Sequence, residues 1–173
     1  MTFRTAGGYA MFEDEKMTGL LARTMFNAAT LKRYDILAYQ IMPDHVHVLV
    51  CSRYACMNTS AGGDTHARGW GNGGAPPRPE RVSVPAMGPS NKQPNISDLI
   101  YAIKSFYFVA ARGQFGINFS FWQRRFYTSI VITPEYLHTI IEYIKHNPVK
   151  GELPEKYCRL PHQFVNWEKI APQ

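Results

Sequence analysis

The chain has 173 residues, of which 45% are hydrophobic and 13% aromatic, with a formal net charge of +6 at pH 7. This composition is typical of one globular domain with a hydrophobic core, and it excludes a wholly disordered or fibrous chain. No uninterrupted apolar run approaches the roughly 18 residues of a membrane-spanning helix, and the first residues lack the pattern of a signal peptide, so we expect a cytoplasmic protein with no membrane partner. The excess of Lys and Arg favours a polyanionic partner, but surface charge that only keeps the protein soluble explains it equally well.

The first elements are a strand, a helix and a hairpin. A short strand over 2–5 precedes an amphipathic helix over about 14–32, whose acidic first turn suits the helix dipole. Residues 34–41 and 45–50 are predicted to be strands because their composition favours extended backbone and a Pro-Asp turn separates them. The sequence therefore predicts that the second and third strands pair directly.

A Gly- and Pro-rich stretch over about 58–95 follows and is expected to be a flexible insertion, because it is too rich in these residues to hold a regular element. After it, Ser97 can cap another amphipathic helix. Residues 126–132 alternate as a fourth strand, and a final helix is predicted over about 135–146, ended by Pro148.

The order β-α-β-β-α-β-α is the split-βαβ pattern, so we predict an α+β, ferredoxin-like fold: an antiparallel sheet with helices on one face and a further C-terminal helix. Residues 1–150 are expected to form this single domain. Residues 151–173 are expected to be a C-terminal tail, with His162 exposed to solvent.

The sequence His45-Val46-His47 lies at the start of the third predicted strand. Residues two apart on a strand point to the same face, so both imidazoles project together. Two neutral imidazoles on a rigid strand form a bidentate site for a metal ion. A pair of exposed or hydrogen-bonded histidines without a ligand is the alternative, and the spacing alone does not decide between them.

On the final predicted helix, Tyr143 and Asn147 are four residues apart and therefore neighbours, beside an apolar stripe that would pack on the sheet. Taken alone, they suit a half-buried aromatic residue and a C-terminal cap ahead of Pro148. That interpretation weakens when the histidine strand is considered with them.

Three sequence blocks occur in order: MPDHVHVLV at 42–50, WQRRFY at 122–127 and YIKHNPVK at 143–150. They resemble the signatures of the REP-associated tyrosine transposases, a branch of the single-tyrosine transposases with a histidine–hydrophobic–histidine (HUH) motif. The resemblance extends from about residue 2 to residue 150. A lone HxH is unspecific, whereas three ordered blocks together are a specific signal.

The resemblance implies a metal-dependent endonuclease and strand transferase that cleaves and rejoins hairpin-forming single-stranded DNA, such as REP-like repeats, through a 5′-phosphotyrosine. It matches His45 and His47 to the metal ligands and Tyr143 to the nucleophile. Asn147 stands where insertion-sequence relatives carry a glutamine that completes the metal site, so its amide oxygen is a candidate ligand. The resemblance also implies a monomer or a homodimer.

The expected cofactor is a divalent ion, Mg²⁺ or Mn²⁺, since Mg²⁺ prefers oxygen ligands whereas imidazoles suit Mn²⁺. Tyr127 is the main rival nucleophile. Candidate contacts to the DNA backbone are Lys104, Arg124, Arg125, Lys145 and Lys150.

Two other functions are compatible with this fold class. A catalytically degenerate relative would be a binding module for single-stranded nucleic acid, but the Lys/Arg-Gly-Phe strand pattern of RNA-recognition domains is not present in the sequence. Phosphoesterases of the 2H type carry two HxT/S motifs, whereas here a second histidine follows His45 and the motif has no duplicate. The combination of His45, His47 and Tyr143 favours the nuclease.

Overall fold

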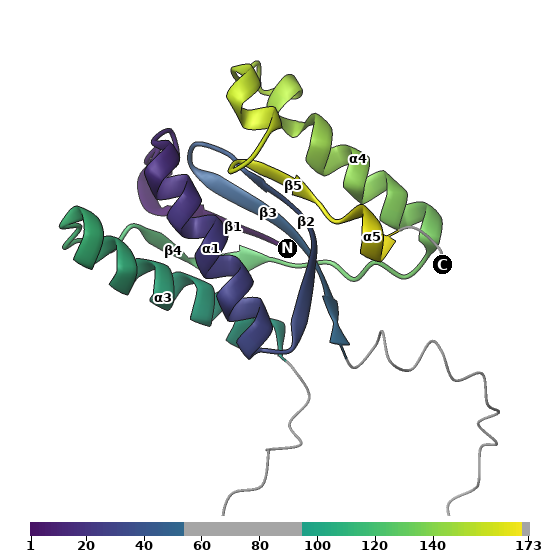
Figure 1. Cartoon of the computed structure of the whole chain (residues 1–173), viewed down its shortest axis with the longest axis horizontal. Coiled ribbons are helices and arrows are strands. Elements are labelled where there is room, and N and C mark those ends of the chain that lie inside the picture. The colour runs from purple at the N-terminus through teal and green to yellow at the C-terminus, as the bar shows by residue number, and fades with distance from the viewer. Residues whose placement is uncertain (54–94, 171–173) are drawn as a thin grey trace, which may run out of the picture.

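The structure is a computed structural model that describes residues 1–53 and 95–170 (Figure 1). The predicted Gly- and Pro-rich insertion over 58–95 falls almost wholly outside the described residues. Five strands of the described part form one sheet in the order β4-β1-β3-β2-β5. The strands are β1 (Thr2–Thr5), β2 (Tyr34–Ile41), β3 (His45–Ser52), β4 (Trp122–Tyr127) and β5 (Gln163–Val165). The helices are η1 (Ala6–Gly8), α1 (Glu15–Leu31), α3 (Ile96–Phe115), α4 (Pro134–Lys150), η2 (Glu155–Cys158) and α5 (Trp167–Ile170).

The sheet confirms the predicted split-βαβ arrangement. Strand β3 lies between β1 and β2 and is antiparallel to both, so the two strands joined through α1 run parallel without touching. Strand β4 pairs antiparallel with the outer side of β1. Within the described residues, no helix is both long enough and apolar enough to cross a bilayer.

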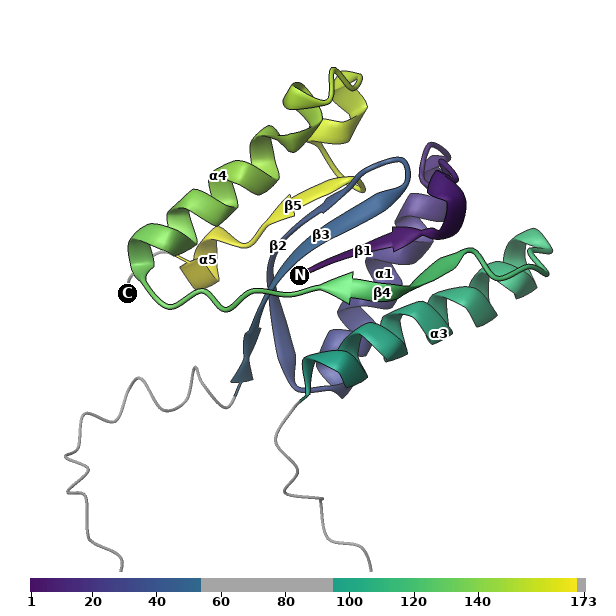
Figure 2. The ribbon, with the colours of Figure 1, turned by 180° about the vertical axis from the view of Figure 1, so that it is seen from behind.

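Helices cover both faces of the sheet (Figures 1 and 2). Helices α1 and α3 pack on one face, where Val46 and Val48 belong to the main hydrophobic core. Helix α4 packs on the other, where Ile141 and Ile144 form a second cluster with Ala38 and Leu49. Successive strand residues point to opposite faces, so Val48 and Leu49 serve different helices.

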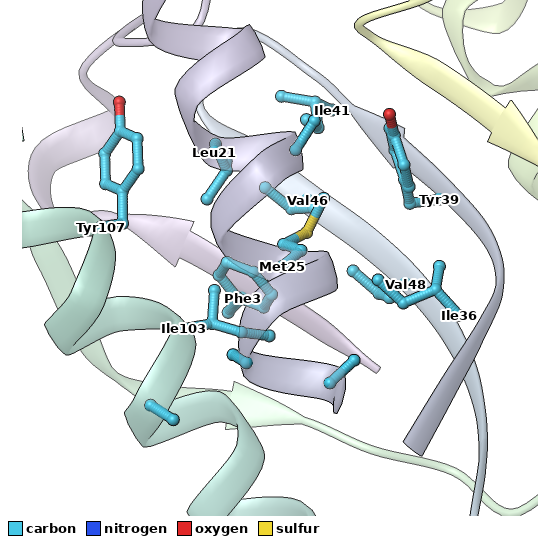
Figure 3. Packing of buried hydrophobic residues seen from close by; sticks show 14 of the residues in the cluster. Phe3, Leu21, Met25, Ile36, Tyr39, Ile41, Val46, Val48, Ile103 and Tyr107 are labelled. Atoms are coloured by element: carbon cyan, nitrogen blue, oxygen red, sulfur yellow. The ribbon is translucent and has the colours of Figure 1, made fainter. Parts of the chain in front are cut away.

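The main core holds the histidine strand in place from behind. Leu21 and Met25 of α1 and Ile103 of α3 pack against Phe3 and Val46, and each of these side chains is at most 1% exposed (Figure 3). Burying an apolar side chain of this size stabilises the fold by about 1.5–3 kcal/mol. Strand β3 is therefore a rigid support for the residues on its opposite face.

Strand β4 differs from the prediction. It covers Trp122–Tyr127 rather than 126–132. The reason is its partner: Tyr127 pairs with Thr2, the first residue of β1, so β1 offers no ladder to the residues after Tyr127. The alternation over 126–132 was therefore a misleading signal.

Helix α4 continues through the proline that was expected to end it. It runs over Pro134–Lys150 with Pro148 in its last turn. The backbone N–H of Gly151 donates to the Asn147 carbonyl at 3.0 Å, so the helical bonding resumes after the proline. Helix α3 likewise begins earlier than predicted, because the Asn95 side chain, rather than Ser97, caps it by accepting from the Ser97 N–H at 2.9 Å.

The residues expected to be a tail fold back onto the sheet. Strand β5 pairs antiparallel with β2, with Gln163 opposite Gln40. His162, predicted to be exposed, is fully buried and lies against the Tyr157 ring, with ring centroids 4.4 Å apart. The short segments after α4 show no long periodicity, which is why the sequence did not reveal them.

Candidate functional site

The two histidines project from β3 toward the face covered by α4, as the two-residue repeat of a strand predicts. Their ring centroids are 4.9 Å apart. His47 lies in the middle of the sheet, paired with Thr2 on β1 and with Gln40 on β2. Since the paired strands fix the backbone on both sides, the spacing of the rings is fixed as well.

The Nδ1 atom of each imidazole is held by the protein. His45 Nδ1 donates to the Asp44 carboxylate at 2.6 Å. His47 Nδ1 shares a hydrogen bond of 2.8 Å with the Thr2 hydroxyl. Metal-binding histidines commonly hold one ring nitrogen in this way, which orients the ring and leaves the other nitrogen to the ion. Both Nε2 atoms therefore remain for a ligand.

His47 is held in its neutral form. Burial, followed by the nearby His45, the N-terminal amine and Arg4, lowers its pKa to about 4. A neutral imidazole is the form that binds a metal ion. At neutral pH His47 is therefore in the form that coordination of a metal ion would require.

Helix α4 places Tyr143 against the histidine strand. The Tyr143 and His47 ring centroids are 5.5 Å apart, with the ring planes at 81°. The buried Ile144 beside it anchors the helix on Leu49, whereas Tyr143 itself is 44% exposed. On the helix's last turn, Lys150 Nζ lies 5.7 Å from the centre of the Tyr143 ring. The phenol is therefore both close to His47 and accessible.

Asn147 lies one turn after Tyr143, and its side-chain nitrogen is buried without a hydrogen-bond partner. A buried amide left unpaired costs about 1–3 kcal/mol, so such a group calls for a functional explanation. The alternative that Asn147 caps the helix is wrong, because α4 continues to Lys150. Its polar side chain is available for another role.

These residues fit a divalent ion in part. Among residues 1–53 and 95–170, no group of three or more His, Cys, Asp or Glu side chains gathers in a way that could hold a metal. The donors from this chain would be two imidazoles and the Asn147 amide oxygen. An ion there would complete its shell with phosphate oxygens and water, as ions that act on phosphate esters commonly do.

A cavity of about 260 Å³ joins the histidine strand to the tyrosine helix. Its walls include His47 and Thr2 from the sheet, Tyr143 from α4 and Tyr127 from the end of β4. Tyr127 is 69% exposed. Both tyrosines therefore face one cavity, and the ring contact with His47 is made by Tyr143.

The five candidate DNA contacts have different surroundings. Arg124 and Arg125 are exposed on the edge strand β4, and Lys150 borders the site beside Tyr143. Lys145 is engaged by Glu142 at 2.9 Å. Lys104 donates to the Gln123 carbonyl at 2.6 Å, and burial lowers its pKa. The two arginines and Lys150 are thus the most available of the five.

Sequence reasoning missed the residues that support the site. Asp44 precedes the first histidine and could have been noticed from that position alone. Thr2, Gln40 and Gln163 come from strands far apart in the sequence, and only the register of the sheet brings them to His47 and α4.

No protein-family model matches the sequence, and no curated protein matches it. The fold is similar to a solved structure of a REP-associated tyrosine transposase bound to a REP hairpin, with a TM-score of 0.57 and 17% sequence identity. The similarity covers 94% of this chain and 72% of that one. This likeness establishes the shared fold, and the hairpin belongs to that other protein.

Proposed function

We propose that this chain is a transposase-like enzyme of the REP-associated tyrosine transposase type, which cleaves and rejoins hairpin-forming single-stranded DNA through a 5′-phosphotyrosine. The observation that carries the proposal is the contact between the Tyr143 and His47 rings, whose centroids are 5.5 Å apart. Both residues line the same cavity, which is open to solvent. The likeness to a hairpin-bound transposase supports it.

His45 and His47, through Nε2, and Asn147, through its amide oxygen, would hold Mg²⁺ or Mn²⁺. When bound, such an ion neutralises charge on the scissile phosphate and so favours attack by an anionic nucleophile. Asp44 and Thr2 keep the imidazoles oriented for this task through the bonds to Nδ1. The neutral His47 ring is the feature of this chain that supports the assignment.

The Tyr143 oxygen would attack phosphorus, and the bond from phosphorus to the 3′-oxygen would break. The phenolic proton is lost to a base or to water, and the departing 3′-oxygen gains a proton to become a hydroxyl. Because the product on the enzyme is still a phosphodiester, a second 3′-hydroxyl can attack it and restore Tyr143 without ATP. Lys150, above the Tyr143 ring, would stabilise negative charge in this step.

The DNA strand would reach this cavity past β4. Arg124 and Arg125 are the exposed cations there, and guanidinium groups pair well with phosphates. The polyanionic partner expected from the net charge of +6 is then single-stranded DNA carrying hairpins. We propose that the protein acts in the cytoplasm as a monomer or a homodimer.

A covalent-trapping assay tests the proposed function. Labelled single strands carrying hairpins from the DNA next to the gene are incubated with protein and MnCl₂ or MgCl₂, then separated on a denaturing gel. We expect a shifted band that EDTA abolishes and protease removes. Tight binding of the same strands without any covalent band would instead favour the alternative, a catalytically degenerate binding module of the same fold.

Replacing Arg125 with Ala is expected to weaken binding of these strands, because the substitution removes a cation that would pair with one backbone phosphate. The slope of log Kd against log salt should fall by about 0.7, the value for one neutralised phosphate on a single strand. Fluorescence anisotropy at several NaCl concentrations measures both quantities. Arg23→Ala is the matched control, because Arg23 is exposed on α1, behind the sheet. Equal effects of the two substitutions would mean that β4 is not the DNA-binding edge.

A further inference from the structure

Two side-chain amides, the buried Gln40 and the half-buried Gln163, tie the C-terminal strand to the tyrosine helix. Gln163 of β5 donates through Nε2 to the Gln40 side-chain oxygen at 2.7 Å and to the Lys145 carbonyl of α4 at 3.0 Å. Gln40 is fully buried and donates in turn to the Tyr157 carbonyl at 2.9 Å. One side chain thus joins the sheet to the helix that carries Tyr143.

The orientation of this network is determined by its backbone partners. Carbonyl groups only accept, so the Gln40 nitrogen must face the Tyr157 carbonyl, and its oxygen must face Gln163. Gln163 then has to present its own nitrogen, whose two hydrogens match the two acceptors. Turning the Gln163 amide around would set an oxygen against two oxygens and leave buried acceptors unpaired.

Gln163 bonds to α4 next to the turn that lacks one of its internal hydrogen bonds. Pro148 has no N–H to donate to the Ile144 carbonyl, so α4 lacks one internal hydrogen bond at that turn. The neighbouring Lys145 carbonyl receives the Gln163 bond. Tyr143 and Asn147 lie on either side of this point, so the position of both depends on how the turn is held.

The same network reaches the histidine strand. Gln40 pairs with His47 across β2 and β3, and with Gln163 across β2 and β5. Directly paired residues point to the same face of a sheet, so His47, Gln40 and Gln163 form a row under α4. Gln163 therefore fixes the tyrosine helix relative to the very strand that presents His47.

From this geometry we infer that Gln163 is a positioning residue, which sets Tyr143 and Asn147 against His47 through the Lys145 carbonyl. The inference rests on the proposed function for its effect on cleavage, and its structural half is independent of that function. Misplacing reacting groups by about 1 Å costs on the order of 10²-fold in rate, so a small shift of α4 matters.

The test uses Gln163→Glu, which keeps the shape but removes both donors, and Gln163→Met, which keeps the length without polar atoms. Gln114→Met is the matched control, because Gln114 is exposed on α3. Adduct formation by both Gln163 variants, measured well below their melting temperatures, is expected to fall on the order of 10²-fold. The Kd for the uncleaved strand should remain close to that of the unsubstituted protein.

A spectroscopic readout separates positioning from general weakening of the fold. The Tyr143 ring lies edge-on to His47 and shifts its ring-proton NMR signals, and Tyr143→Leu gives the signals without that ring. In both Gln163 variants the His47 signals should move toward those of Tyr143→Leu, and in Gln114→Met they should not. Unmoved His47 signals together with undiminished cleavage would overturn the inference.

The remaining outcomes are also decisive. If the unsubstituted protein forms no adduct, the proposed function fails, while the His47 signals still report whether Gln163 positions the helix. If neither Gln163 variant folds, hydrogen exchange of the Gln163 side-chain amide in the unsubstituted protein replaces them. Exchange much slower than that of a free amide supports the network, and exchange at the free rate overturns it.

Discussion

Replacing Tyr143 with Phe is expected to abolish the covalent protein–DNA adduct while leaving the affinity for the DNA strand nearly unchanged. The substitution removes the oxygen that would attack phosphorus, and it keeps the ring that packs beside His47. Deleting a covalent nucleophile in other enzymes lowers the rate by on the order of 10⁴-fold or more, so the adduct should fall below detection. Trapping on a denaturing gel and fluorescence anisotropy measure the two quantities.

Tyr127→Phe is the matched control for this experiment. Tyr127 lines the same cavity and differs from Tyr143 in lying on β4, outside ring contact with His47. We expect the Tyr127 variant to form the adduct. If it loses the adduct and the Tyr143 variant retains it, then the nucleophile is on the strand rather than on the helix.

Replacing His47 with Ala should remove metal-dependent cleavage and weaken binding of Mn²⁺. The substitution deletes a ring that is neutral, oriented by Thr2 and next to Tyr143, the proposed nucleophile. Removing the residue that orients a metal ligand costs about 10–100-fold in metal affinity or activity, and removing the ligand itself costs more. Thr2→Val should therefore lower the Mn²⁺ affinity less than His47→Ala does.

Titration of Mn²⁺ followed by electron paramagnetic resonance measures metal binding without reference to activity. Mn²⁺ binding should weaken in the order unsubstituted protein, Thr2→Val and His47→Ala. An unchanged Mn²⁺ affinity in His47→Ala would place the ion elsewhere or exclude it from this site. The adduct assay on the same proteins would then show whether cleavage needs the ion at all.

The features that could be predicted from the sequence are those with short-range signals. The helix over α1 and the pairing of β2 with β3 follow from apolar periodicity and from a Pro-Asp turn. The alignment of His45 with His47, and of Tyr143 with Asn147, follows from the repeats of a strand and of a helix. These local patterns were enough to predict the split-βαβ sheet and to place His47 and Tyr143 on the two elements that line the cavity.

The features that escaped prediction depend on contacts between distant segments. Strand β4 ends at Tyr127 because β1 offers it no partner beyond Thr2. Helix α4 passes through Pro148, and the nearby Lys145 carbonyl accepts a hydrogen bond from Gln163 of β5. Neither contact is visible within the segment that it affects.

The orientation of the histidines likewise depends partly on a local pattern and partly on a contact between distant segments. Spacing alone predicts that the two rings share a face, but the bond from Thr2 to His47 joins residues 45 positions apart. That contact depends on β1 lying beside β3 in one register. A one-residue slip of β1 would turn Thr2 to the other face and leave His47 without its partner.

The position of β5 in the chain bears on when the protein becomes active during its own synthesis. A nascent chain folds from its N-terminus as it leaves the ribosome, at roughly 5–20 residues per second. The histidine strand and the tyrosine helix both emerge before Gln163, which holds that helix in place. If Gln163 has the inferred role, a chain made only as far as the end of α4 carries every reacting group of the proposed cleavage and lacks their final arrangement. Under the proposed function, the order in which these segments are made would delay DNA cleavage until β5 has paired with β2.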